Sequence, residues 1–427
     1  MNGVLGWHGR ASLVLAAGMM IGAGADAQEA NTVTSDIGGS ARLSAWSSDR
    51  SLNERRGAAV LSAWVNAKVD YSGTRFVFDG WVAGESKAAG AQHERSNRER
   101  HLVREAYADW RFGDCSARLG RQIISWGRAD GINPLDRISP RDYTLLVPEE
   151  ADNQWGADGV QLSCEVAKGT LSAGAFAPFG GSTVPLPLRT DLQYQTAGSE
   201  GPIRRAMKYE RNNGALDWSV SWYQGSDVLP ETAAVTLGAG GVSGTLRVPT
   251  VRVLGHDGSW ALPGPMAGTV LRWEAAYTKG VNEIDRWADN LMAVAGAEVG
   301  LDAGATVSAQ WIGQRWNSFI QPDMSLANPA GFAALLDAPL NHRFDRVSHG
   351  AMLRWRKPWL NDRLVTDLTL LYDVTRKSRM VRGKANYSID DQWRMVAAFD
   401  HLSGEEQSSF GVLKANNLLV LEVRRLF

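Results

Sequence analysis

The sequence has little cysteine, little net charge and no long hydrophobic run. Two of its 427 residues are cysteine, and the formal net charge is −1. A nearly neutral chain has no surplus of positive charge that would attract nucleic acid. After the amino terminus, no stretch approaches the roughly 18 apolar residues of a transmembrane helix. A phosphate-binding glycine loop and a cysteine–histidine cluster are also missing, so we expect no nucleic-acid partner, no cofactor and no metal.

The amino terminus has the pattern of an export signal. Arg10 provides a positive charge, residues 11–23 form a short apolar run, and small residues precede a cleavage position between Ala27 and Gln28. An apolar run of this length is too short to span a bilayer stably. The pattern predicts a signal peptide over 1–27 and a short periplasmic segment over 28–38. The alternative is a membrane anchor helix.

Apolar and polar residues alternate along much of the remaining chain. Apolar residues from Leu61 to Tyr71 occupy every second position, and the alternation recurs in 270–278, 364–374, 381–389 and 392–400. Because successive side chains of a strand point to opposite faces, each segment is predicted to be a strand with one apolar face. Most segments have about 9–14 residues, as tilted membrane strands do, whereas soluble strands usually have about 5–6. A soluble β-sandwich gives the same alternation and is the alternative.

The connections between these segments are alternately short and long. Tight turns at one end and longer loops at the other are typical of barrels in the bacterial outer membrane. We predict an all-β fold over 39–427, a single transmembrane antiparallel up-and-down barrel with about 18 strands and periplasmic termini; 16 strands are the alternative. The long outer loops include 127–153, 181–202, 227–248 and 317–346. The expected location is the cell outer membrane, with the lipid bilayer and lipopolysaccharide around the barrel.

The chain ends on an alternating strand with an aromatic carboxyl-terminal residue. Leu421, Val423 and Phe427 lie on one face of this strand. The last strand of a closed barrel pairs with the first, so its end is held in the sheet and does not fray. We expect these three residues to form the signal that the barrel-assembly machinery recognises. The alternative is the last strand of a soluble β domain.

The two cysteines test the register of the predicted sheet. Cys115 begins one predicted strand, and Cys164 lies near the end of the next. If residues whose numbers sum to 279 are paired, the cysteines face each other, and Leu119 and Val160 share their apolar face. An oxidising compartment permits a disulfide in this position. We predict a cross-strand disulfide near the periplasmic end; two unrelated small apolar residues are the alternative.

The segment 118–159 is the richest in turn-forming and charged residues. A predicted strand ends at Trp126, and a loop with three prolines and several acidic residues follows. Proline and Asx turns give such a loop a defined conformation at little entropic cost. We expect it to constrict the barrel; a disordered outer loop is the alternative. The residues assigned to the constriction are Arg121, Gln122, Trp126, Gly127, Asp130, Asn133, Pro134, Asp136, Pro140, Arg141 and Asp142.

The acidic residues of this loop have two interpretations. Asp130, Asp136 and Asp142 carry carboxylates of the kind that bind calcium, although their spacing lacks the EF-hand pattern. Pairing with the arginines of the same loop is the interpretation that we favour.

The loop 317–346 contains a predicted short helix over 328–338. Asn328 is a helix-capping residue, and Pro329 is favoured in the first turn of a helix. We expect this helix to plug or cover the mouth of the barrel.

The motifs of the segment 118–159 resemble those of known barrel families. Gly-Arg-Gln at 120–122, Trp-Gly at 126–127, Asn-Pro-Leu-Asp at 133–136 and Pro-Arg-Asp at 140–142 are similar to an uncharacterised outer-membrane barrel family. Members of that family are commonly encoded beside exporters of the RND superfamily. The Leu-Gly-Arg-Gln strand is also similar to the alginate-export and porin-like barrels. The resemblance implies a passive conduit, or a partner of an RND-type or polysaccharide export system, and not an enzyme.

The polar faces of the later strands are rich in basic residues. The lumenal and selectivity residues that we predict from the alternation are Arg272, Arg354, Arg356, Arg382, Lys384 and Arg394. We expect Arg354, Lys384 and Arg394 to form a basic wall opposite Asp130 and Asp136, with Arg272 farther away. Basic residues along a pore guide anionic solutes. Internal salt bridges that merely fill the barrel are the alternative.

The predicted function is therefore a channel or export conduit for anionic organic or polysaccharide-type solutes, narrowed by loop 127–153. A non-conducting structural or adhesive barrel is the first alternative. An outer-membrane hydrolase is the second, and it would need a serine and a histidine within hydrogen-bonding reach. Ser348 and His349 are neighbours on a strand and point to opposite faces, and His401 near Ser403 has no third member.

Overall fold

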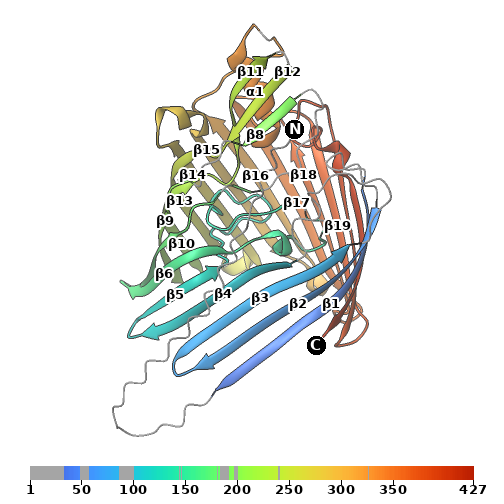
Figure 1. Ribbon diagram of the computed structural model, residues 1–427. Coiled ribbons are helices and arrows are strands. Elements are labelled where there is room, and N and C mark those ends of the chain that lie inside the picture. Colours follow the sequence, from blue (N-terminus) through green and yellow to red (C-terminus); the bar gives the residue numbers. More distant parts are fainter. Residues whose placement is uncertain are drawn as a thin grey trace, which may run out of the picture.

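The computed structural model is a closed barrel of 18 antiparallel strands (Figure 1). The structure describes residues 33–427 apart from 49–56, 86–100, 144, 146, 180, 183–191, 197–200, 239–240 and 326. The barrel strands are β1 (Thr34–Ser48), β2 (Gly57–Tyr71), β3 (Thr74–Glu85), β4 (His101–Phe112), β5 (Cys115–Gln122), β6 (Ala157–Val166), β7 (Gly169–Phe176), β9 (Arg204–Asn213), β10 (Leu216–Ser226), β13 (Thr250–Ala261), β14 (Thr269–Gly280), β15 (Asn290–Gly300), β16 (Thr306–Trp316), β17 (Val347–Trp359), β18 (Leu364–Asp373), β19 (Ser378–Ser388), β20 (Trp393–Ser403) and β21 (Leu418–Leu426). The predicted fold with 18 strands is confirmed.

The first and last strands close the barrel. Ser40 of β1 pairs with Leu426 of β21, and the backbones of Gly39 and Phe427 exchange two hydrogen bonds of 3.0 and 3.2 Å. A Cβ atom on Gly39 would lie 2.7 Å from the Phe427 ring, so glycine leaves the space that this ring fills. The first strand begins at Thr34, whereas the predicted barrel begins at residue 39. The predicted signal peptide 1–27, with Ala27 and Gln28, lies outside the described residues.

The outer face of the barrel is apolar. Large apolar side chains that are exposed on it include Leu43, Leu61, Phe76, Leu119, Leu254, Trp311, Leu353, Leu368, Phe399 and Leu421. A barrel in a bilayer needs an apolar outer belt, because its outer face contacts lipid. It also needs a sheet without free edges, because unpaired backbone groups are costly in lipid. The protein is thus a transmembrane barrel of the outer membrane. Within the described part of the chain, no helix is long and apolar enough to cross a membrane.

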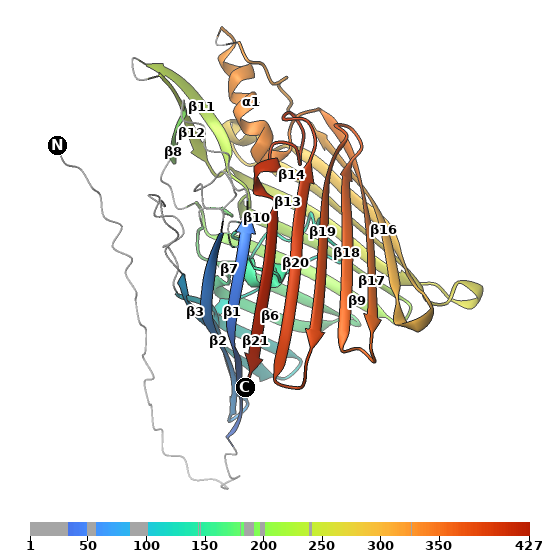
Figure 2. The ribbon, with the colours of Figure 1, turned by 90° about the vertical axis from the view of Figure 1, so that its right-hand side faces the viewer.

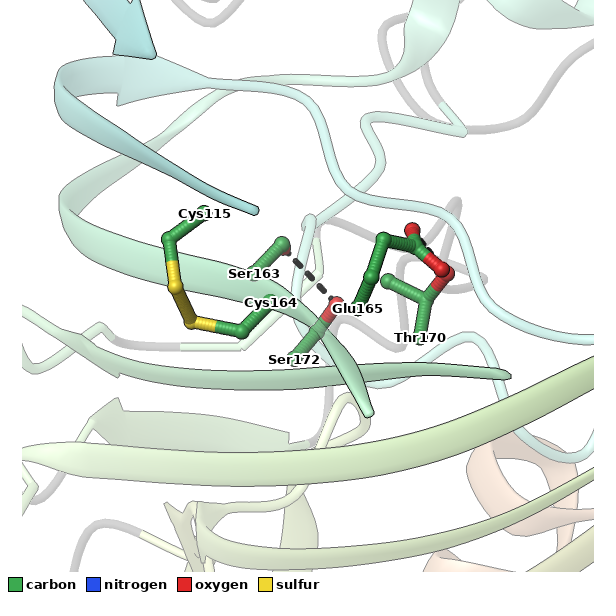
Figure 3. Close-up of a disulfide and its surroundings, with 6 residues drawn as sticks. All are labelled: Cys115, Ser163, Cys164, Glu165, Thr170 and Ser172. Carbon is green, nitrogen blue, oxygen red and sulfur yellow. Dashed lines mark hydrogen bonds between the residues drawn. A yellow bond between two sulfur atoms is a disulfide. The ribbon is translucent and has the colours of Figure 1, made fainter. Parts of the chain in front are cut away.

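The predicted disulfide is confirmed. Cys115 and Cys164 are direct partners in the pairing of β5 with β6, and their Cα atoms lie 4.0 Å apart (Figure 3). Leu119 and Val160, paired in the same register, are both exposed on the apolar face. Beside the disulfide, the hydroxyl groups of Ser163 and Ser172 form a 2.8 Å hydrogen bond between β6 and β7.

The outer end of the barrel carries a second, smaller sheet and a helix. Strands β8 (Leu192–Thr196), β11 (Glu231–Gly238) and β12 (Gly241–Arg247) form a three-stranded sheet beside α1 (Pro329–Asn341), which projects beyond the barrel strands (Figure 2). The predicted loops 181–202 and 227–248 therefore contain strands. The predicted helix is present, and the side-chain oxygen of Asn328 accepts a 3.0 Å hydrogen bond from the Gly331 backbone. Short 3-10 helices are η2 (Glu150–Asn153), η3 (Gly264–Met266), η4 (Glu283–Ala288), η5 (Asp302–Gly304) and η6 (Lys414–Asn416).

Candidate functional site

The segment 123–156, between β5 and β6, lies inside the barrel. It forms ion pairs with strands on different sides of the lumen: Arg128 with Asp257 on β13, at 2.8 Å, and Lys384 on β19 with Glu149, at 2.7 Å. A segment in contact with strands so far apart around the barrel must cross the lumen, and its cyan-to-green chain lies within the ring of strands (Figure 1). The structure thus places the predicted constriction loop, 127–153, within the barrel.

The Asn-Pro motif at 133–134 holds the first turn of this segment. The Asn133 amide nitrogen donates to the Trp126 carbonyl at 2.7 Å, and its oxygen accepts from the backbone N–H groups of Leu135 and Asp136 at 3.0 and 3.1 Å. Gly127 has a φ of 99°, and a Cβ atom there would lie 2.3 Å from the Asn133 side chain. The turn therefore needs both asparagine and glycine at these positions.

Apolar side chains of the segment pack against the barrel wall. The buried cluster that they share with the wall comprises Ile124, Trp126, Leu135, Ile138, Ala157, Phe176, Ala206, Tyr223, Val251, Val253, Ala276 and Ala288. Burial of this kind stabilises each large side chain by about 1.5–3 kcal/mol. It fixes the first half of the segment on the β6–β14 side of the barrel.

Glu274 on β14 holds the same half of the segment through hydrogen bonds. Its carboxylate is buried and accepts from the backbone N–H groups of Arg128 and Ala129. The Arg128 guanidinium pairs with Asp257, not with an acidic residue of its own loop. The role of Glu274 as an acceptor for loop backbone was not predicted from the sequence.

Asp136 lines the same cavity as Arg354, Arg382 and Lys384 but forms no ion pair with these cations. Its carboxylate pairs with Arg141 of the same segment at 2.8 Å and accepts from the Gln154 amide at 3.4 Å. The favoured pairing with a loop arginine thus holds for Asp136, whereas Asp130 pairs with Arg272 of the barrel wall. Nearby, the Pro140 carbonyl accepts from the Trp155 N–H, and the Asp142 N–H donates to the Asn153 carbonyl, both at 2.8 Å. These bonds join residues 140–142 of the segment to residues 153–155.

Arg121 and Gln122 lie on β5 and not in the crossing segment. Arg121 pairs with Asp158 on β6 at 2.7 Å, on the face that it shares with the exposed Leu119. Gln122 is fully buried and donates to the Gly159 carbonyl at 3.4 Å. The assignment of Arg121 to the constriction is therefore wrong.

Four predicted lumenal cations contact acidic residues of the segment: Lys384, whose pair with Glu149 is described above, and three arginines. Asp130 pairs with Arg272 at 3.1 Å and with Arg354 at 3.8 Å. Arg272 is thus a neighbour of Arg354, although it was expected farther away. On β19, Arg382 pairs with Glu150 of the segment and, at 2.6 Å, with Asp400 of β20.

Two other predicted cations form no ion pair with the segment. Arg356 and Arg394 are exposed, and neither has an ion pair among the described residues. In the predicted basic wall, Arg382 replaces Arg394. Arg42 and Arg424, which contact Asp152 and Glu149 respectively, were not predicted to contact the loop. The consecutive acidic residues Glu149 and Glu150 after Pro148 are the sequence signal for a contact between the loop and basic residues of the wall.

The lumenal residues of β17 to β20 form rows across the sheet. The row nearer α1 is apolar and contains Met352, Leu371, Met380 and Leu402. The next row contains Arg354, Thr369, Arg382 and Asp400, and the third contains Arg356, Asp367, Lys384 and Ala398. Successive rows are two residues apart along each strand, about 7 Å. An apolar row therefore lies directly beside a row with two arginines.

A cavity of about 770 Å³ opens between these rows and the crossing segment. Its lining includes Ile132 and Glu150 of the segment, Leu340 near the end of α1, and the lumenal faces of β15 to β21. Its floor is charged and its wall on the α1 side is largely apolar. The arrangement suits a solute with an acidic group and an apolar group.

Two of the residues considered for a hydrolase, His349 and Ser403, make other contacts. The His349 ring lies beside Trp311, which is exposed on the outer face, with ring centroids 5.8 Å apart. Ser348 and His349 both contribute to the cavity lining, and no hydrogen bond joins their side chains among the described residues. Ser403 accepts a 3.2 Å hydrogen bond from Arg379, and within the part of the chain that the structure describes no hydrogen bond joins it to His401.

The fold is shared with porins of known structure. OccAB1 of Acinetobacter baumannii is 14% identical, with a TM-score of 0.56 over 92% of this chain and 96% of that one. OccK9 (OpdG) of Pseudomonas aeruginosa is 12% identical, with a TM-score of 0.56 over 92% and 97%. The outer-membrane protein OprD of Pseudomonas aeruginosa is 11% identical, with a TM-score of 0.55 over 92% and 94%.

At these identities the likeness establishes the fold alone. It supports the porin-like barrel expected from the motifs, and not the RND-associated or alginate-export resemblance. No family model and no curated protein matches the sequence.

Proposed function

We propose that the protein is an outer-membrane channel for small organic anions, with the segment 123–156 narrowing its lumen. The observation that carries the proposal is the cavity in which Arg354, Arg382 and Lys384 lie beside an apolar row. Basic residues in a pore attract anions, and apolar side chains accommodate the hydrophobic part of a solute. The rows are about 7 Å apart, which matches a short alkyl or aryl carboxylate.

The same lining favours organic anions over polysaccharides. A polysaccharide carries hydroxyl groups along its whole length, and these would lose hydration against Met352, Leu371 and Met380 without gaining hydrogen bonds. A passive channel has no built-in direction, so the proposal covers uptake and release. An RND-type or polysaccharide export system, lipopolysaccharide and the barrel-assembly machinery stay predicted partners.

Single-channel recording in planar bilayers tests the proposal. The purified barrel should conduct, and hexanoate should interrupt the current more often than acetate does, because only hexanoate has a chain that reaches the apolar row. Heat-modifiable migration on a gel establishes that the barrel is folded. A folded, inserted barrel that carries no current would favour the alternative, a non-conducting structural or adhesive barrel in which the ion pairs across the lumen fill it.

A further inference from the structure

The part of the segment nearest β19 presents three carboxylates to cations of the barrel wall. Glu149 pairs with Lys384 at 2.7 Å and with Arg424 at 3.5 Å. Glu150 pairs with Arg382, and Asp152 with Arg42 at 2.6 Å. Three loop carboxylates thus occupy positions at which the wall would otherwise hold an anion.

These pairs differ in their access to solvent. The side chains of Arg42 and Asp152 are 12% and 10% exposed, and the Arg42 guanidinium stacks on Trp64 at 3.9 Å. Arg104 donates to the Ala151 carbonyl at 2.6 Å and so holds the adjoining backbone. The segment is therefore anchored at residues 151–152.

The other two pairs face the cavity. Glu149, Glu150, Arg382 and Lys384 all line it, whereas Arg42 and Asp152 do not. The Glu150 side chain is 62% exposed, and those of Arg382 and Lys384 are 32% and 29% exposed. The pair of the exposed Glu150 with Arg382 is weak, at about 0–1 kcal/mol, because water solvates it. The Glu149 side chain is 25% exposed and has two cations, Lys384 and Arg424, within 3.5 Å. Both pairs can exchange while the anchor at Asp152 holds.

We propose that Glu149 and Glu150 are built-in competing anions, which occupy the anion site formed by Arg382 and Lys384 until the carboxylate of a passing solute displaces them. This inference rests on the proposed channel function. It assigns Arg382 and Lys384 to solute binding, and it makes Glu149 and Glu150 determinants of affinity.

The exchange costs little because each charge is either paired or solvated by water before and after it. The solute carboxylate replaces the glutamate at the cation, and the glutamate moves into the water of the cavity. The tethered carboxylate has a high effective concentration, in the millimolar range, so a solute needs an additional interaction to win. The apolar row on the α1 side of Arg382 supplies it for solutes with a hydrocarbon chain.

Shortening the glutamates separates this exchange from a simple charge effect. The double variant Glu149→Asp/Glu150→Asp keeps both negative charges but lacks one methylene group in each side chain, so the carboxylates no longer reach the cations. We expect about two- to fivefold tighter hexanoate binding, as expected from weakening an ion pair of this strength. The matched control is Glu406→Asp, which shortens an exposed glutamate paired with Lys414 in an outer loop.

Hexanoate affinity is measured both from current block and by calorimetry on the detergent-solubilised barrel. Unchanged affinity in a conducting double variant would overturn the inference and leave the channel function standing. A wild-type barrel without current would contradict the channel function. Calorimetry on the two variants would still show whether hexanoate competes with Glu149 and Glu150. If the double variant does not fold, Glu150→Gln replaces it, because the Glu150 side chain is mostly exposed. Unchanged hexanoate affinity in that variant would also overturn the inference.

Discussion

The Lys384 ammonium donates to the Glu149 carboxylate at 2.7 Å, although the two residues are 235 positions apart in the chain. This bond joins the lumenal face of β19 to the segment that crosses the barrel. The selectivity of the channel therefore depends on the wall and the segment together, and a change on either side alters the charge that a solute meets.

Neutralising the cations of β19 should reduce anion preference. In Arg382→Gln/Lys384→Gln, Glu150 loses its partner and Glu149 keeps only Arg424 at 3.5 Å, so the negative charge of the segment repels anions more strongly. We expect the anion-to-cation permeability ratio, obtained from reversal potentials, to fall by a factor on the order of three to ten. Arg394→Gln is the control, because Arg394 is exposed and lies outside the cavity lining. An equal or larger fall in the control would disprove the assignment of these cations.

Removing the Glu274 carboxylate should loosen the crossing segment. Glu274→Ala leaves the N–H groups of Arg128 and Ala129 without their buried acceptor, at about 1–3 kcal/mol for each. We expect larger and noisier single-channel currents from a barrel that still folds. The control is Glu298→Ala on the next strand, whose carboxylate contacts Arg272 and not the loop backbone. Identical currents in the two variants would contradict the role of Glu274 in holding the segment.

Adding a methyl group at Gly39 should impair barrel closure. A Cβ atom there would lie 2.3 Å from the Trp64 carbonyl oxygen and 2.7 Å from the Phe427 ring, so Gly39→Ala strains the β1–β21 seam by about 1–3 kcal/mol. The measurement is the fraction of heat-modifiable protein in outer membranes. At the neighbouring Gly38, the nearest atom is a flexible Asn66 side chain at 3.3 Å, and Gly38→Ala should assemble normally. Normal assembly of both variants would refute the packing role of Phe427.

The outer sheet should be more stable at low pH. Burial raises the pKa of Glu231 from its ordinary value of 4.5 to about 7, although its partner Arg247 opposes the shift. The folded state thus favours the protonated carboxyl group, and this stabilisation is complete below pH 4.5 and is lost as the pH rises through about 7. Hydrogen exchange of β11 and β12, corrected for intrinsic rates, should be slower at pH 5 than at pH 8. Glu231→Gln should remove the difference, and its persistence would show that another group titrates.

The sequence predicted well what depends on local pattern. The alternation of 60–71 defined β2, the sum of paired residue numbers placed Cys115 opposite Cys164, and Asn328 with Pro329 located the start of α1. In each case neighbouring residues, or two adjacent strands, carry the whole signal.

The sequence predicted poorly what depends on the path of the crossing segment. Alternation assigns Arg272 and Arg394 to the lumenal face but does not say which of them an acidic loop residue reaches. Asp136 was expected to face the wall, yet Arg141 lies five positions away in the same loop and pairs with it. The strands β8, β11 and β12 were also missed, because short strands in outer loops lack the length and apolar face of membrane strands.

The reversal potential of the wild-type barrel under a potassium chloride gradient tests the central claim most directly. The account predicts conduction with a preference for chloride, because Arg354, Arg382 and Lys384 line the cavity within the lumen. The preference should decrease as ionic strength rises, since salt screens the lumenal charges. A cation-preferring current, or a folded and inserted barrel that carries no current, would contradict the account.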